Sequence, residues 1–129
     1  GNRGVGLSVG YNDAVTLDLD LFFNKFMIGG HYGSRIIEET LETYQTQTEA
    51  AATIGYLVTK KMYLKVGGGV AYDEIPVTTS YNTEISFNEE ETYLRFGLQW
   101  FLKGRAFAFI PELFFTTTGG PGASIGFAF

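Results

Sequence analysis

Residues 15–23, VTLDLDLFF, place a large apolar side chain at every second position, with Thr16, Asp18 and Asp20 between them. Because successive side chains of a β-strand point to opposite faces, this period of two predicts a strand with one apolar and one polar face. An amphipathic helix would instead repeat its apolar residues roughly every three or four positions. The stretch therefore predicts a β-sheet protein and sets a pattern against which the rest of the chain can be tested.

The same alternation recurs in seven further segments, which predicts eight strands in one domain, residues 1–129. In each segment one face is large and apolar, while the other is small, polar or charged and rich in glycine. Short connections between most segments are typical of antiparallel strands joined as hairpins. The expected segments are 3–11, 15–23, 26–36, 49–58, 62–73, 91–102, 107–116 and 123–129.

The turns test this assignment, because a register slip of one residue would exchange the two faces. Turns at residues 24–25, 59–61, 103–104 and 118–122 all keep the faces consistent. The pairs expected across them are Phe23 with Phe26, Val58 with Met62, Leu102 with Arg105, and Thr117 with Ala123. Pro111 does not suit a regular strand with two partners, so we expect a lost ladder bond or a bulge there.

Composition and charge narrow the function classes. The formal net charge of −5 argues against nucleic-acid binding, because phosphates call for clustered basic residues. The chain has no cysteine, which removes disulfides and thiolate metal ligands. No stretch approaches the roughly 18 consecutive apolar residues of a transmembrane helix. We therefore expect strands to carry any contact with a membrane.

The two faces suit a membrane barrel better than a soluble one. A narrow barrel has little room for bulky apolar side chains, whereas a small, polar and charged face fits its lumen. Segments of about ten residues, when tilted, span the hydrocarbon layer of a bilayer. We predict an all-β fold, an eight-stranded antiparallel up-and-down transmembrane β-barrel with a salt-bridged lumen. The expected lumen network is Asp18, Asp20, His31, Arg35, Lys65, Arg95 and Glu112.

The two rims of this barrel are expected to differ. One, the short-turn rim, would hold both termini and the tight turns, and the far rim would hold long acidic connections at 38–47 and 76–89. The basic residues gathered at the short-turn rim are Arg3, Lys25, Lys60, Lys61, Lys103 and Arg105. Aromatic residues beside it form the expected lipid-facing girdle, consisting of Phe23, Phe26, Trp100, Phe107, Phe127 and Phe129.

The tail Ile125-Gly126-Phe127-Ala128-Phe129 is the most specific motif of the chain. It resembles the assembly signal of small Gram-negative outer-membrane β-barrels, the OmpA/OmpX-type group and its opacity-protein relatives. The resemblance is architectural and covers the whole chain. It implies a monomeric outer-membrane protein that contacts lipid bilayer and lipopolysaccharide and is recognised by the barrel-insertion machinery through Phe129.

No residue pattern supports catalysis, and we expect no enzyme activity, cofactor or metal site. His31 is the only histidine, and none of the serines carries a motif that would make it a partner in a catalytic triad. The triplet 67–69, three glycines, lacks the Lys-Ser/Thr and helix of a phosphate loop and fits strand coiling instead. The expected role is therefore non-enzymatic, with surface recognition or adhesion carried by the long acidic loops.

Two alternatives remain open at the level of sequence. A soluble, calycin-like lipid-binding barrel would place Leu17, Leu64, Phe96 and Phe109 inside, and Asp18, Lys65 and Arg95 outside. A narrow outer-membrane pore or transporter for small apolar solutes would keep the membrane arrangement but need an opening that the sequence does not reveal.

Overall fold

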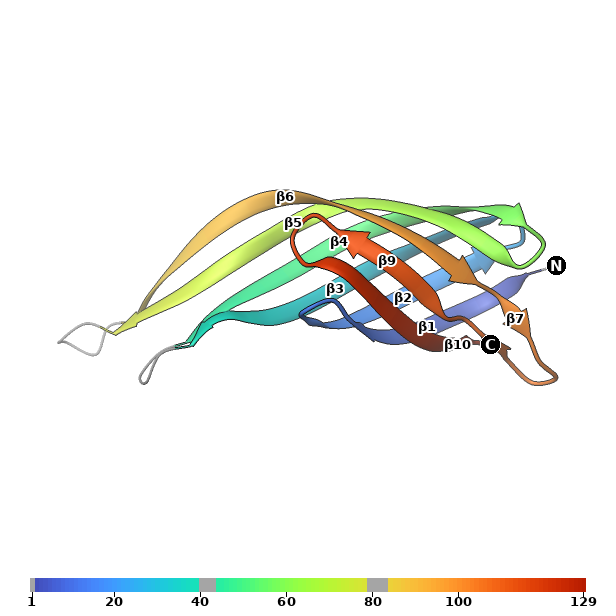
Figure 1. Cartoon of the computed structure of the whole chain (residues 1–129), viewed down its shortest axis with the longest axis horizontal. Coiled ribbons are helices and arrows are strands. Elements are labelled where there is room, and N and C mark those ends of the chain that lie inside the picture. The colour runs from blue at the N-terminus through green and yellow to red at the C-terminus, as the bar shows by residue number, and fades with distance from the viewer. Residues whose placement is uncertain (1, 40–43, 79–83) are drawn as a thin grey trace.

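The computed structural model shows a closed antiparallel β-barrel (Figure 1). It describes residues 2–39, 44–78 and 84–129, and the surroundings of side chains at 2–35, 46–72 and 91–129. Strands β1 to β6 pair in chain order, β6 pairs with β9 and β9 with β10, and β1 pairs with β10 to close the barrel. The short strands β7 and β8 pair with each other, and β8 also pairs with β10. The strands are β1 Arg3–Tyr11, β2 Val15–Phe23, β3 Phe26–Glu39, β4 Tyr44–Thr59, β5 Met62–Thr78, β6 Glu84–Trp100, β7 Leu102–Lys103, β8 Ala108–Phe109, β9 Glu112–Thr116 and β10 Gly120–Ala128.

Two of the eight strands of the barrel are interrupted, and the short strands β7 and β8 are the second piece of one and the first piece of the other. β7 continues the line of β6 beyond Phe101, and β8 precedes β9 with Ile110 and Pro111 between them. The carbonyl of Pro111 accepts a bond from Trp100 N–H at 2.9 Å, and Ile110 N–H donates to Gly126 at 2.9 Å. The irregularity expected at Pro111 is confirmed as a break between β8 and β9. The two hydrogen bonds keep this segment attached to the strands on either side.

The division into two faces is confirmed by the burial of alternate residues. Along β2 the apolar Leu17 and Leu19 are 47% and 54% exposed, whereas Asp18 and Asp20 are 2% and 0% exposed. Leu64 and Phe96 are also exposed on the outside, and Phe109 is half-buried. The soluble, calycin-like arrangement required these apolar side chains inside, so that alternative is wrong. A barrel with an apolar outside can satisfy its backbone within a bilayer.

The tightest predicted turn is confirmed, since Phe23 pairs with Phe26 across Asn24-Lys25. Asn24 has a φ of 69°, a left-handed conformation that asparagine tolerates better than most residues. Asp13, with a φ of 62°, plays the same part in the turn between β1 and β2.

Three predicted turns have the right faces but the wrong pairing. Thr59, rather than Val58, pairs with Met62, because a two-residue turn is combined with a bulge between Leu57 and Thr59. The bulge supplies the extra residue that a three-residue turn was expected to supply. The other pairs in place of those predicted are Leu102 with Phe109, rather than Arg105, and Thr116 with Gly120, rather than Thr117 with Ala123.

The two long connections are shorter than predicted, because strands occupy much of both. β3 and β4 extend to Glu39 and from Tyr44, and β5 and β6 extend to Thr78 and from Glu84. The resulting hairpins project beyond the rest of the barrel at the end away from both termini (Figure 1). The remaining parts of the predicted loops, 40–43 and 79–83, lie outside the described residues.

Candidate functional site

The lumen holds a network of buried charges that the alternation of the strands brings together. Neighbouring strands contribute residues of the same inward parity, so their side chains meet across the barrel axis. Among the described residues, four carboxylates face three fixed cations and the one histidine. These buried groups are Asp18, Asp20, Glu49, Glu112, Lys65, Arg95, Arg35 and His31.

Lys65 on β5 is the centre of the part of the network nearer the short-turn rim. Its Nζ lies 3.3 Å from a carboxylate oxygen of Asp20 on β2 and 3.0 Å from one of Glu112 on β9. Because the ammonium is 0% exposed, both carboxylates act on it with little screening by water. The amide nitrogen of Gln99 also donates to Asp20, at 3.4 Å.

Arg95 on β6 joins this cluster to the next one along the axis. Its Nη2 donates to Asp18 at 2.9 Å and forms an ion pair with Glu112 at 2.8 Å. The guanidinium also lies 4.6 Å from the centre of the Phe114 ring, a cation–π arrangement. One side chain thus bridges β2 and β9 through charge and stacks on a third group, as a planar guanidinium can.

His31 on β3 lies between two carboxylates. Its Nδ1 is hydrogen-bonded to Asp18, and its Nε2 lies 3.3 Å from an oxygen of Glu49. Ionised carboxylates only accept hydrogen bonds, so only the doubly protonated ring can donate in both directions. Arg35 then continues the network toward the far rim, with Nη2 3.2 Å from Glu49 and Nη1 2.5 Å from Gln47.

Inward-facing glycines make room for this network. A Cβ at Gly97 would collide with a Glu112 oxygen, and one at Gly33 would lie 2.8 Å from a Glu49 oxygen. In the glycine triplet, a Cβ at Gly69 would collide with the carbonyl of Ala50, whereas one at Gly68 would point outward and meet only atoms 3.9 Å away. At Gly69 the triplet thus allows close approach of β4 and β5, a role that was not expected from the sequence.

The lumen near the short-turn rim is filled by apolar side chains. Phe22 contacts Tyr63 and Phe101 edge to face, with ring centres 5.4 and 4.9 Å apart. Met27 and Ile110 belong to the same cluster and are both 0% exposed. The Tyr63 hydroxyl donates to the carbonyl of Asn24 in the turn below. This cluster closes one end of the lumen beneath the charged network.

The structure places every residue of the predicted lumen network inside the barrel, where they form one connected set. Sequence reasoning left out Glu49, which bridges His31 and Arg35, although its inward parity was readable from the alternation. It also left out uncharged members, because polar side chains without charge give no signal beyond parity. These are Asn12, Gln47, Gln99, Thr116 and Thr118.

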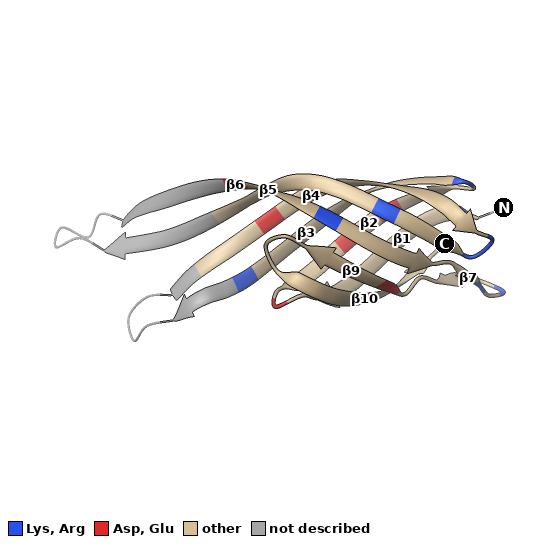
Figure 2. Cartoon of the chain, turned by 45° about the horizontal axis from the view of Figure 1, so that its top comes forward, with Lys and Arg blue, Asp and Glu red and all other residues tan. Residues whose placement is uncertain are grey.

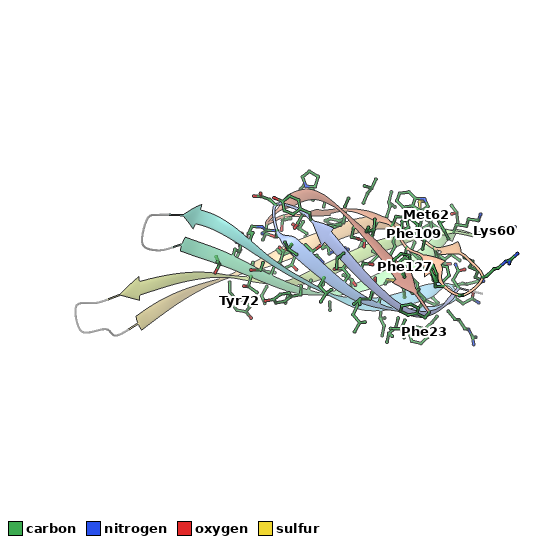
Figure 3. The ribbon with its side chains drawn as sticks, turned by 90° about the horizontal axis from the view of Figure 1, so that it is seen from below. Phe23, Lys60, Met62, Tyr72, Phe109 and Phe127 are labelled. Carbon is green, nitrogen blue, oxygen red and sulfur yellow. The ribbon has the colours of Figure 1, made fainter. Side chains whose placement is uncertain are left out.

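The predicted girdle residues lie on the outside near the short-turn rim. Phe107 contacts Phe127 edge to face at 5.0 Å, and Phe26 contacts Tyr56 in the same way at 5.4 Å. Trp100 is half-buried, and Phe129 is 75% exposed. In Figure 3, Phe23, Met62 and Lys60 lie toward this rim, far from Tyr72. The basic turns beside them are visible in Figure 2.

The polar groups of the lumen pair mainly with one another. The ring nitrogens of His31 are occupied by carboxylates, and neither contacts a serine hydroxyl among the described residues. Within the same residues, no cluster of three His, Cys, Asp or Glu side chains could hold a metal ion. No helix in the described part of the chain is long and apolar enough to cross a membrane.

Comparison with known proteins supports the fold. No family model and no curated protein matches the chain. Among solved structures it is similar to Ail, the attachment invasion locus protein of Yersinia pestis, solved in complex with the heparin analogue sucrose octasulfate. The identity is 13%, the match covers 97% of this chain and 91% of that one, and the TM-score is 0.54.

Designed transmembrane β-barrels are also similar. One matches 100% of this chain and 97% of its own at 16% identity with a TM-score of 0.48, and the design TMB2.3 matches 99% and 94% at 14% identity with a TM-score of 0.46. The similarity to Ail, together with the apolar outside and charged lumen, identifies the fold as an eight-stranded transmembrane β-barrel of the outer-membrane type.

Proposed function

We propose that the protein is a non-enzymatic, integral outer-membrane barrel that binds an extended partner along the protruding hairpins and keeps its lumen closed. The observation that carries the proposal is an open strand edge. β6 pairs with β5 over its whole length, from Glu84 to Trp100, but with β9 only from Arg95 to Gln99. One edge of β6 therefore has no strand partner over residues 84–93 among the described residues.

The backbone geometry indicates which residues offer this edge. Leu94 accepts from Thr117 N–H at 3.0 Å, and Leu94 N–H donates to the Thr117 hydroxyl at 3.0 Å, so the polar backbone groups of Leu94 face β9. In an antiparallel ladder, groups two residues apart face the same neighbour. Those of Thr92, Glu90 and Asn88 thus face the open edge, where an added strand could pair with them.

Charge indicates the chemistry of the partner. Residues 84–93 carry Glu84, Glu89, Glu90 and Glu91 and no basic residue. An extended segment with basic side chains would pair with this edge and be attracted to it. Sucrose octasulfate, the ligand in the Ail structure, is a polyanion and would be repelled by this acidic edge. We therefore expect it to bind this chain weakly or not at all.

Blocking the edge tests the proposal. Thr92→Pro removes the N–H that faces the open edge and leaves the bonds to β5 in place, and Thr92→Val is the matched control that keeps the N–H. The probe is a fluorescent peptide of alternating Lys and Thr, measured by anisotropy on barrels in detergent micelles. We expect binding to be retained in Thr92→Val and lost in Thr92→Pro. Equal binding by both variants would contradict edge recognition.

The filled lumen supports closure rather than conduction. Lys65, Arg95 and Tyr63 are 0% exposed, so both the charged network and the apolar cluster exclude water-filled space around them. Planar-bilayer recordings of the folded chain should show no steady channels. Sustained large conductance steps would favour the pore for small solutes instead.

The remaining expectations complete this proposal. The protein would be a monomer in the outer membrane of a Gram-negative bacterium, in contact with bilayer lipid and lipopolysaccharide, and the insertion machinery would recognise its strand β10 through Phe129. Alanine in place of Phe129 should slow insertion into vesicles that contain that machinery more than insertion into detergent. Equal slowing in both would indicate a purely structural role.

A further inference from the structure

The exposed charges of the barrel are separated by sign along its axis. Six basic residues lie at the short-turn rim, in the turns or at the start of β1, whereas the exposed acids Asp13 and Glu91 lie toward the far rim. None of the six forms an ion pair with another described residue. They are Arg3, Lys25, Lys60, Lys61, Lys103 and Arg105. The short-turn rim is therefore a cationic surface without internal neutralisation among the described residues.

Three of these cations line one pocket, at the seam where β1 and β10 meet the turn between β7 and β8. The pocket has a volume of about 170 Å³ and is lined by Arg3, Lys103 and Arg105. The turn that carries two of them is fixed by a bond from Gly104 N–H to the Phe107 carbonyl at 2.8 Å. Phe129 lines the same pocket and forms no ion pair with the three cations.

The pocket lies at the height of the aromatic girdle. Phe107 and Phe129 line it and are 48% and 75% exposed on the outside of the barrel. Aromatic residues of a membrane barrel gather at the level of the lipid headgroups. A ligand in this pocket would therefore be at the depth of a phosphate group in the adjoining leaflet.

A second hollow shares one lining residue with this pocket. It has a volume of about 370 Å³, and the shared residue is Arg3. Val5, Leu21 and Phe23 line it from the outer face, and Gly4 and Phe22 complete the lining. The combination of a cationic pocket and an apolar hollow on either side of one arginine suits an amphiphile. A free phosphate ion would use only the first part.

We propose that Arg3, Lys103 and Arg105 form a binding site for the headgroup phosphate of one anionic phospholipid in the leaflet at the short-turn rim, with an acyl chain along Val5 and Phe23. A guanidinium can bind a phosphate through two parallel hydrogen bonds, and the ammonium adds a point charge. A basic residue beside an anionic headgroup strengthens its association about fivefold, and this contribution falls off within a Debye length.

The chain offers a matched pair of variants for the test. The site variant combines Arg3→Gln, Lys103→Gln and Arg105→Gln. The control combines Lys25→Gln, Lys60→Gln and Lys61→Gln, which removes the same charge from the same rim but outside the pocket. Folding of both is checked by heat-dependent migration on a gel. The probes are spin-labelled phosphatidylglycerol and phosphatidylcholine in phosphatidylcholine bilayers, whose motionally restricted fractions give the selectivity for the anionic lipid.

We expect the unaltered chain to prefer phosphatidylglycerol, with a selective population that saturates at one lipid per barrel. The site variant should lose at least about tenfold in selectivity, and the control less than about threefold. Equal losses of selectivity in the site variant and the control would show that the rim attracts anionic lipid only through its general positive charge. That result would overturn the proposed site.

Two further measurements use only the unaltered chain. Non-saturating selectivity in the unaltered chain would also overturn the site, so the proposal can fail even if a variant does not fold. Inorganic phosphate at millimolar concentration should not displace the labelled lipid. Complete displacement would show an anion site that does not require lipid and would contradict the acyl-chain contact.

Discussion

His31 shows how one residue completes the charge balance of the lumen. Four buried carboxylates face three fixed cations, so a protonated His31 makes the described network neutral. Its two ring nitrogens face Asp18 and Glu49, which is the geometry that this state requires. Because these groups are buried, removing one partner leaves an uncompensated charge and lowers the stability of the barrel.

Replacing His31 by glutamine should therefore destabilise the barrel at neutral pH. We expect the free energy of unfolding, measured by urea titration in micelles, to fall by about 3–5 kcal/mol. Tyr32→Phe, at the next position on the lipid-facing side, is the control and should change it by less than about 0.5 kcal/mol. In a double-mutant cycle, Asp18→Asn should cost less in the His31→Gln background than alone. Strict additivity would contradict direct coupling.

The glycine triplet offers a second comparison between adjacent residues. A Cβ at Gly69 would collide with the backbone of β4, which cannot retreat without breaking the ladder, so Gly69→Ala should cost about 1–3 kcal/mol. Gly68→Ala meets only atoms 3.9 Å away and should be neutral within about 0.5 kcal/mol. The same urea titration measures both. A larger loss at Gly68 would mean that the faces of β5 are assigned the wrong way round.

At the scale of the strand, the sequence predicts which face points into the lumen and which points outward. It predicts the ends of the strands less well. Alternation within the bilayer is strong because one side meets lipid and the other a polar lumen. The sequence loses its apolar alternation over residues 38–47 and 76–89. Backbone pairing nevertheless continues at the described residues of these ranges, 38–39, 44–47, 76–78 and 84–89. That loss explains why the far ends of β3, β4, β5 and β6 were expected to be loop.

The residues that pair across a turn were predicted correctly only where the residues of the turn determine the pairing. Asn24-Lys25 is such a case, because a left-handed asparagine fits the tight hairpin. At residues 103–104 the register depends on contacts with other strands and on the break at Pro111, neither of which is visible locally. For the same reason, parity identified the inward residues of the site, but no local pattern identified which charges would meet.

Trp100, the only tryptophan, allows the depth of one strand end to be measured. At the end of β6, beside the short-turn rim, it should be quenched most by lipids brominated near the glycerol backbone. Trp100→Phe combined with Leu19→Trp moves the probe to the middle of β2, where deep bromines should quench most. The same depth profile for both proteins would contradict the placement of the girdle.

At the scale of the whole molecule, the apolar outside makes folding depend on an amphiphile. Outward residues such as Leu7, Leu19 and Ile125 are 49%, 54% and 57% exposed, which is a large apolar surface for water to cover. We expect the chain to aggregate in buffer, to fold in detergent micelles, and to migrate differently on a gel before and after heating. A folded monomer in buffer without detergent would contradict a membrane barrel.

The seam between β1 and β10, which pairs Gly6 with Ala128, has a consequence for the timing of assembly. The first and last strands meet across almost the whole chain, and pairing over such a separation is slow because the loop must first close. Until it forms, β1 and β10 each present a free edge on which neighbouring chains can aggregate. Whatever holds these two strands together during that interval will raise the yield of finished barrels without changing the stability of any one of them.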